Sequence, residues 1–372
     1  SGFISKHPDT VLIIIDTLQK VREMGGENYS YANDYQIITK LKRFADNNGV
    51  CLMLVHHTRK QQADDKFDMI CGTSTGGLIA MALASDVKID QICDLYLNNA
   101  KKIFPKKLIS ILPGILFKSK YKNDGLRSCL ENIFKDRTLG NTKNLLCIPS
   151  YSVTNAATVV FKNRLQKSII NDKSLNEDNN LKLVDVGLAT SAAPTYFPMV
   201  DFYYKHKKQQ FIDGAVWANN PTMVGLIEAL NYFVNNRNSD LNTDYDYENI
   251  QILSISSLNR SQEIEDFVNP NRAFLDWGGK LFDVYMKGNS DFNHYFLEII
   301  KQNMVHGSNI DYIRIPSPVI NKKVESKIEI DSTDPEILKL LVKYGNEQFE
   351  FYKNNEGLKN ILHSDQTLHF GT

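Results

Sequence analysis

The stretch from residue 69 to residue 80, MICGTSTGGLIA, decides the fold of this sequence, because a serine lies between two glycines where a strand should turn into a helix. The apolar residues before Gly72 predict a buried strand, and the small apolar residues after Gly76 predict a closely packed helix. A tight strand-to-helix turn projects a serine clear of its own backbone, although the turn holds that residue in a strained conformation. We therefore expect an α/β fold in which Ser74 is the candidate nucleophile.

The glycines around Ser74 meet the needs of such a turn. Gly72 and Gly76 lie two residues on either side of the serine and avoid a collision with it, and Gly77 lets the helix begin close to the sheet. The start of a helix offers free N–H groups and a positive dipole end, so the N–H of Thr75 is a candidate donor to a developing oxyanion. A phosphate-binding turn is the competing interpretation. It fits less well, because no lysine follows the paired glycines as the GxxxxGK[ST] pattern requires.

Composition limits the class of protein. The chain has 372 residues and a formal net charge of zero, so no bulk charge favours nucleic acid as a partner. Five cysteines are dispersed without CxxC spacing, which predicts reduced thiols in a cytoplasmic compartment, and the histidines form no HxxxH pair, so no metal is expected. No apolar run reaches the roughly 18 residues that span a bilayer, and we expect no secretory signal and no cofactor.

Strand and helix patterns alternate along the chain. Continuous β-branched apolar runs predict buried strands at 11–16 and 50–55. Further strands are expected at 67–71, 144–148, 157–161, 210–212 and 250–255, and helices at 32–48, 76–84, 89–103 and from Pro335 onward. This alternation predicts an α/β fold with a mainly parallel central sheet, helices on both faces and a helical C-terminal tail.

A serine hydroxyl needs a base, and two arrangements compete for that role. The order serine, acid, histidine would make a triad of Ser74, Asp213 and either His294 or His306. The other arrangement is a dyad of Ser74 and Asp213 alone. Neither histidine lies in a glycine-rich, turn-like context, which favours the dyad.

The aspartate lies in a second strong signal, 210-QFIDGAVWANNP-221, in which a strand ends at Asp213. Gly214 and Ala215 keep the site open, and a turn follows before the next helix. The carboxylate must lose part of its solvation to become a useful base, because its ordinary pKa of about 3.9 is too low. The competing interpretation is that Asp213 only caps its own loop.

At this point the sequence resembles the patatin-like phospholipase family over about residues 67–318. FDMICGTSTGG from residue 67 is similar to the nucleophile elbow of that family, and FIDGAVWANNP from residue 211 is similar to its aspartate motif. ATSAAPTYFP from residue 189 and the helix over 90–105 match two further blocks. The resemblance implies a lipid acyl hydrolase that cleaves phospholipid or other acyl-lipid esters through a Ser74–Asp213 dyad and an acyl-enzyme, with no metal, cofactor or catalytic histidine.

The residues that the resemblance assigns to the elbow and oxyanion support are Gly72, Thr73, Thr75, Gly76 and Gly77, and those of the aspartate motif are Gly214 and Ala215.

One part of the family pattern is missing. Patatin-like enzymes begin with a strand and a DGGGxRG-type loop whose backbone N–H groups form the oxyanion hole. Here the first strand is followed by 16-DTLQKVR-22, which contains no glycine. Losing one oxyanion donor typically costs about 10²–10³ in rate. The alternative function is therefore a catalytically impaired patatin-like binding module.

Residues 8–66 resemble part of a RecA-type ATPase of the replicative-helicase kind. Asp16 matches the acid at the end of a Walker B strand, and residues 56–60 match the end of a sensor strand. The Walker A loop is absent, so we expect no ATPase activity. We predict three parts: an N-terminal segment over 1–66 that completes the sheet, the acyl hydrolase domain over 67–318, and a helical extension over 319–372.

The apolar stretch 108–117, LISILPGILF, has lysines on both sides. Such a stretch suits peripheral contact with an anionic membrane surface, because it is too short to span the bilayer. The competing interpretation is a segment packed in the core.

Overall fold

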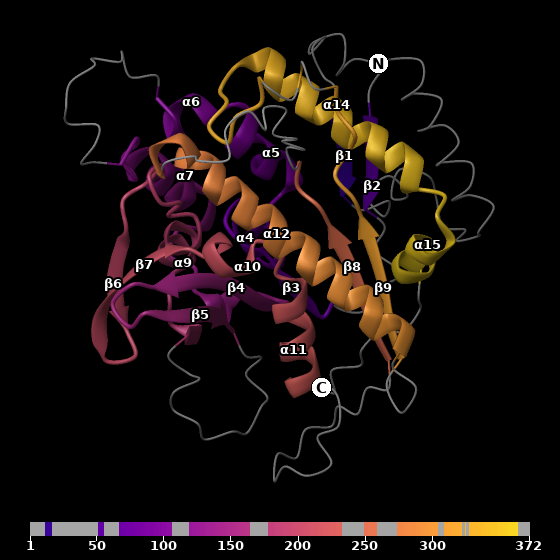
Figure 1. The fold of residues 1–372 in the computed structure, drawn as a ribbon, viewed down its shortest axis with the longest axis horizontal. Helices are drawn as coiled ribbons and strands as arrows, with labels where there is room; N and C mark the ends of the chain where they lie inside the picture. The colour runs from indigo at the N-terminus through magenta and orange to yellow at the C-terminus, as the bar shows by residue number, and fades with distance from the viewer. Residues whose placement is uncertain are drawn as a thin grey trace, which may run out of the picture.

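The computed structural model describes residues 12–16, 51–55, 67–105, 119–163, 178–232, 249–258, 274–303, 309–321, 324 and 327–363 (Figure 1). The helix predicted over 32–48 and the apolar stretch 108–117 lie outside these residues. The predicted strands at 11–16 and 50–55 are confirmed as β1 (Leu12–Asp16) and β2 (Cys51–Val55), which pair in parallel. Within the described residues these two strands form a separate sheet and bond only to each other.

A five-stranded mixed sheet lies at the centre of the fold, with β4 as its common partner. Its strands are β3 (Met69–Cys71), β4 (Leu145–Ser152), β5 (Ala157–Lys162), β6 (Val200–Tyr204) and β7 (Lys207–Asp213). β3 runs parallel to β4, whereas β5 and β7 run antiparallel to it, and β6 pairs antiparallel with β7.

The register places β3 and β7 on the same edge of β4. β5 occupies one edge of β4 from Cys147 to Ser152. A strand has only two edges, so β3, which pairs with residues 145–147, and β7, which pairs with residues 150–152, must share the other. Because β3 is parallel to β4 and β7 is antiparallel, their carboxyl ends point toward each other. The residues that follow β3 therefore meet the last residue of β7.

One face of the sheet is covered by four helices around the main core. They are α4 (Thr75–Ala84), α5 (Ile89–Leu97), α7 (Asp124–Phe134) and α9 (Leu183–Thr190). The sheet contributes fully buried Leu146, Ile148, Phe161 and Phe211 to this core. The ring of Phe211 stacks on that of Phe202 at 4.7 Å and meets the edge of Phe161 at 5.3 Å.

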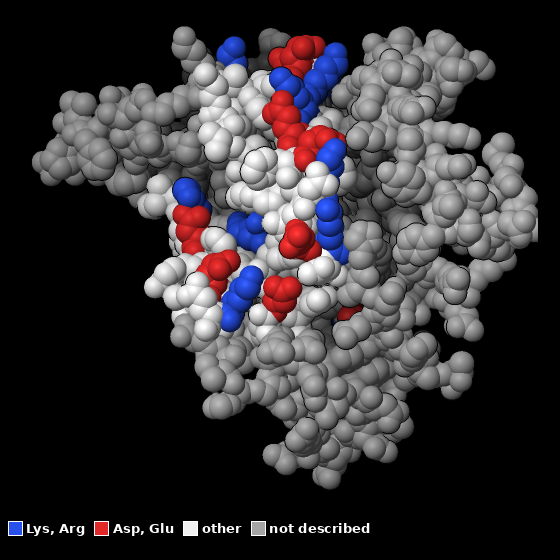
Figure 2. Space-filling view, turned by 90° about the vertical axis from the view of Figure 1, so that its right-hand side faces the viewer, with Lys and Arg blue, Asp and Glu red and all other residues white. Residues whose placement is uncertain are grey.

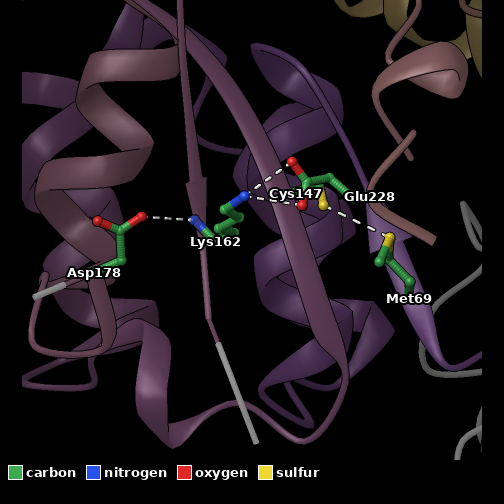
Figure 3. A network of polar contacts seen from close by, with 5 residues as sticks. All are labelled: Met69, Cys147, Lys162, Asp178 and Glu228. Carbon is green, nitrogen blue, oxygen red and sulfur yellow. Dashed lines mark hydrogen bonds and ion pairs between the residues drawn. The ribbon is translucent and has the colours of Figure 1, made fainter. Parts of the chain in front are cut away.

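The opposite face carries α10 (Ala215–Ala218) and α11 (Thr222–Tyr232). Because side chains alternate along a strand, Cys147 leaves the main core and packs here with Ala218 and Val224. Lys162 of β5 donates to both carboxylate oxygens of Glu228 on α11 at 2.9 Å, beside Cys147 (Figure 3). This partly buried ion pair fixes α11 over the sheet.

The C-terminal part adds a second layer. β8 (Asn249–Ile255) pairs in parallel with β9 (Asn309–Ile315), and the long α12 (Phe274–Asn303) packs on them (Figure 1). α14 (Pro335–Tyr352) and α15 (Glu356–His363) follow. The helix start predicted at Pro335 is confirmed, with the side chain of Asp334 accepting from the Glu336 N–H at 2.9 Å. The predicted α/β class, with helices on both faces and a helical C-terminal region, is confirmed. The prediction of a mainly parallel central sheet is wrong, because three of the four strand pairings in that sheet are antiparallel.

One predicted helix is divided in two. The pattern over 89–103 predicts a single helix, but α5 ends at Leu97 and a short α6 (Ala100–Ile103) follows. Asn98 and Asn99 explain the break, because their side-chain amides donate to Asp94 at 2.6 and 2.9 Å and compete with the helical pattern. A 3₁₀ turn, η2 (Leu139–Asn141), precedes β4.

The described surface on the side of α14 and α15 mixes both signs of charge, and Figure 2 shows Lys and Arg interspersed with Asp and Glu. In the described part of the chain, no helix is both long and apolar enough to cross a bilayer.

The aromatic core beneath β7 should dominate stability. Phe211→Ala removes a fully buried ring, and we expect it to lower the free energy of unfolding by about 3–5 kcal/mol in urea denaturation. Phe351→Ala is the matched control, because its ring is 78% exposed and its loss should cost little. Similar losses in the two variants would contradict the placement of the core.

Candidate active site

Ser74 occupies a sharp turn between β3 and α4. Its backbone has φ 57° and ψ −125°, a conformation that side chains other than glycine adopt at a cost, so the predicted strained turn is present. A Cβ at Gly72 would lie 2.1 Å from the carbonyl oxygen of Gly76, so this position admits only glycine. A Cβ at Gly77 would lie 3.0 Å from the side chain of Thr190. A Cβ at Gly76 would meet no atom within 4 Å, so the predicted steric need is visible at Gly72 and absent at Gly76.

The register of the sheet brings Ser74 to Asp213. The Ser74 hydroxyl donates to Oδ2 of Asp213 at 2.6 Å, across 139 residues of sequence. The other carboxylate oxygen, Oδ1, accepts from the N–H of Ala215 at 2.8 Å. Both oxygens of this side chain, which is only 2% exposed, are thus paired.

The environment of Asp213 is suited to a base. Burial raises the pKa of the carboxyl from its ordinary value to about 7, while the hydrogen bonds from Ser74 and Ala215 lower it and oppose that effect. A carboxylate with a pKa near neutrality is a far better proton acceptor than one in water, yet remains largely ionised at slightly alkaline pH.

Thr190 is a contact that the sequence patterns did not single out. Its hydroxyl donates to the carbonyl oxygen of Pro149 at 2.7 Å and accepts from the backbone N–H of Ser74 at 3.0 Å. Thr190 is fully buried at the end of α9. Its two hydrogen bonds connect the elbow to the middle of β4. The only signal available in the sequence was its position inside the ATSAAPTYFP block.

The other predicted residues surround this pair. Gly214 allows a close approach, because a Cβ there would lie 2.2 Å from the Pro149 carbonyl oxygen. Ala215 begins α10 and is buried. The buried side chain of Thr73 donates to the carbonyl oxygen of Ala218 at 2.6 Å, which joins the elbow to α10.

The exposed candidate oxyanion donor at the elbow is the N–H of Thr75. The N–H of Ser74 is taken by Thr190, and that of Gly76 bonds to the Thr73 carbonyl at 2.9 Å. Thr75 is exposed at the first position of α4, and within the described residues its N–H has no acceptor. The segment 16-DTLQKVR-22 lies outside the described residues apart from its first residue, so the expected loss of a glycine loop stays a prediction.

The histidines of the alternative triad are accounted for as far as the structure describes them. Nδ1 of His294 lies 3.0 Å from the hydroxyl of Tyr312, between α12 and β9, so this ring pairs with the tyrosine. His306 lies outside the described residues. Among the described residues no group of three or more His, Cys, Asp or Glu side chains is arranged to hold a metal ion.

The fold and the site define an α/β protein with a serine elbow facing a buried aspartate. The family model of patatin-like phospholipases matches residues 47–226, which confirms the resemblance to that family. A second model, of an AAA domain, matches residues 4–63 and agrees with the ATPase-like character of the N-terminal segment.

Curated relatives point to the same family. The chain is 26% identical to a "cGAMP-activated phospholipase" of Pseudomonas aeruginosa (strain BWHPSA011 / Pa011) over 274 residues, covering 72% of this chain and 74% of the relative. A protein of the same name from Escherichia coli (strain TW11681) is 26% identical over 310 residues, covering 80% and 82%. "Patatin-like protein 2" of Arabidopsis thaliana is 28% identical over 318 residues, covering 76% and 73%.

The raised pKa of Asp213 predicts a pH-dependent stability. The folded protein, with a pKa of about 7, binds this proton more tightly than the unfolded chain, whose ordinary value is 3.8. The stabilisation that this proton gives the folded protein is therefore fully present below pH 4 and is lost as pH rises to 7. Above pH 7 the stability no longer changes through this group. Between pH 4 and pH 8 the free energy of unfolding of the wild type should fall by on the order of 4 kcal/mol relative to that of Asp213→Asn, as measured by urea denaturation.

Asp136→Asn is the control for this measurement, because its side chain is 95% exposed and the variant should follow the pH profile of the wild type. A constant difference between Asp213→Asn and wild type across the pH range would contradict the buried, high-pKa carboxyl.

The bridging role of Thr190 is tested by removing only its hydroxyl. Thr190→Val leaves the partly buried Ser74 N–H and the buried Pro149 carbonyl without this partner, and we expect labelling of Ser74 by a fluorophosphonate probe to slow by about tenfold. Thr190→Ser should restore most of the rate. Thr158→Val, on the exposed part of β5, is the matched control, and equal rates for Thr190→Val and Thr158→Val would refute the role.

Proposed function

We propose that the protein is a lipid acyl hydrolase of phospholipase A or lysophospholipase type that acts through Ser74 and Asp213. The single observation that supports this most directly is the 2.6 Å hydrogen bond from the Ser74 hydroxyl to a buried carboxylate. A lipid ester is the substrate class that the patatin-like domain favours.

The proposed reaction has two halves. Asp213 accepts the hydroxyl proton through Oδ2 as the Ser74 oxygen attacks the ester carbonyl carbon. The tetrahedral intermediate collapses to an acyl-enzyme, and the departing alcohol takes the proton from Asp213. Water then gives a proton to the same carboxylate, attacks the acyl carbon and releases the fatty acid, and the proton returns to the serine oxygen.

The proposed site has few donors to stabilise the negative charge of the oxyanion. The exposed N–H of Thr75 and the start of α4 are the donors that we assign to the oxyanion. An oxyanion hole normally has more than one donor, and the glycine-rich loop that supplies it in the family is missing from the sequence. We therefore expect turnover about 10²–10³ below that of a complete site.

A catalytically impaired module that binds lipid is the second candidate, and the absence of the glycine loop from the sequence favours it. In that case the hydrogen bond between Ser74 and Asp213 has a structural role only. Turnover of a short-chain ester separates the two candidates, because a binding module has none.

A cytoplasmic location and peripheral contact of 108–117 with a membrane remain predictions from the sequence. So do the division of the chain at 66 and 318 and the lack of a nucleic-acid partner.

The dyad is tested by hydrolysis of a p-nitrophenyl short-chain ester. Ser74→Ala and Asp213→Asn should each lower kcat by at least about 10³, because the nucleophile is lost in one variant and its base in the other. kcat/KM of the wild type should rise with pH and level off above a midpoint near 7, where Asp213 becomes ionised.

Ser128→Ala and Asp136→Asn are controls away from the pair and should retain full activity. Residual turnover that is equal in wild type and Ser74→Ala would rule out the hydrolase proposal and leave the binding module.

A further inference from the structure

Arg314 is a cation in an unusual setting at the carboxyl end of β9. Nη1 donates to the hydroxyl of Ser254 at 2.8 Å, and Nη2 donates to those of Ser256 and Ser290 at 3.2 and 3.1 Å. The three serines come from the end of β8, the residues after it, and α12. A guanidinium is thus held at the carboxyl end of two parallel strands by three neutral groups.

Within the described part of the chain, the charge of Arg314 has no counter-ion. Among the described residues no carboxylate forms an ion pair with it, whereas Arg127 pairs with Asp185 and Lys162 pairs with Glu228. The three serine hydroxyls are neutral, and so is the Tyr312 hydroxyl that also interacts with the guanidinium, so the full positive charge remains. The side chain is half-buried, so water compensates the charge only in part.

The neighbouring start of α11 adds further donors. Oγ1 of Thr222, the first residue of α11, lies 3.2 Å from the hydroxyl of Ser254. Within the described residues the next two N–H groups of this helix, those of Met223 and Val224, bond to no backbone carbonyl. The positive end of the helix dipole therefore lies at the same hydroxyl that Arg314 contacts.

An unpaired donor also lies at this corner. Asn220 is only 5% exposed, and its Nδ2 has no hydrogen-bond partner in the structure, while its Oδ1 accepts from the N–H of Thr222 at 3.2 Å. A buried amide donor without an acceptor is costly and rare in native proteins.

We propose that Arg314, with Thr222, Ser256 and Asn220, forms a binding site for a phosphate group. A phosphate suits this set, because its oxygens accept from a guanidinium fork, from hydroxyls and from helix N–H groups at once. The site lies outside the Ser74–Asp213 pair and is a second site on the molecule.

The site is physically connected to the aspartate motif. On α12, next to Ser290, Asn289 donates to the carbonyl of Trp217 at 2.7 Å and accepts from the N–H of Asn219 at 3.1 Å. Farther along α12, Asn293 donates to the carbonyl of Asn220 at 2.8 Å. These contacts join the helix that carries Ser290 to the loop that follows Asp213. The phosphate can belong to a lipid headgroup or to a soluble ligand, and the chemistry of recognition is the same.

Binding is measured on the full chain carrying Ser74→Ala, so that lipid is not consumed and the outcome does not depend on hydrolysis. Inorganic phosphate should raise the melting temperature above that in chloride of equal ionic strength. Adding Arg314→Gln should weaken this phosphate binding by at least about tenfold, and adding Arg314→Lys should weaken it less, because the charge remains. Arg127→Gln is the matched control and should leave the effect of phosphate unchanged.

The source of the phosphate is tested with phosphatidylcholine vesicles that contain a minority of phosphatidic acid. A headgroup site predicts Arg314-dependent vesicle binding that inorganic phosphate competes away. A site for a soluble ligand predicts vesicle binding that is equal with and without Arg314→Gln, while the effect of phosphate on melting still requires Arg314.

Equal stabilisation by phosphate and chloride, or equal loss of the effect in the Arg314→Gln and Arg127→Gln variants, would overturn the proposal. If Arg314→Gln does not fold, Arg314→Lys and Ser256→Ala carry the same test, and no weakening in either would also overturn it.

Discussion

The site depends on one topological constraint, which is that two strands share a single edge of β4 and approach it from opposite ends. β3 ends at Cys71 opposite Cys147, and β7 ends at Asp213 opposite Ser150, so the edge beside Pro149 pairs with neither strand. A proline normally disrupts a central strand, because it lacks the N–H that a neighbour would accept. Here its carbonyl faces the unpaired gap, where Thr190 binds it. The missing N–H therefore costs no ladder hydrogen bond, and the gap holds the serine and the aspartate.

Burial of Asp213 is the electrostatic counterpart of this geometry. A carboxylate that is 2% exposed is destabilised in its charged form, and two hydrogen bonds offset only part of that cost. The fold supports the cost through the packed ring of Phe211, two residues earlier on the same strand, and through close contacts that glycine permits at Gly72 and Gly214. The stability of the packed core thus offsets the backbone strain at Ser74 and the cost of burying a charged carboxylate at Asp213.

How much of the structure could be predicted from this sequence depends on how far apart in the sequence the interacting residues are. The elbow, the strand before it and the helix start at Pro335 depend on neighbours in sequence, and all three could be predicted. The pairing of Ser74 with Asp213 was predicted from two separate motifs together with the family resemblance, because no local pattern encodes a contact across 139 residues. Thr190 and Arg314 were not found. The role of each depends on partners from several elements, and a single threonine or arginine in sequence gives no sign of them.

The elbow also explains why charge stabilisation, rather than the nucleophile, should limit the proposed reaction. Thr190 orients the turn by accepting the Ser74 N–H, and that contact removes one backbone donor from the vicinity of the serine oxygen. Among the donors nearest to Ser74, the exposed N–H of Thr75 is then the one that can turn toward an oxyanion. Positioning and oxyanion stabilisation compete for the same short run of backbone. The resemblance implies that donors from a separate glycine-rich loop relieve this competition, and the segment 16-DTLQKVR-22, which begins at the last residue of β1, contains no glycine.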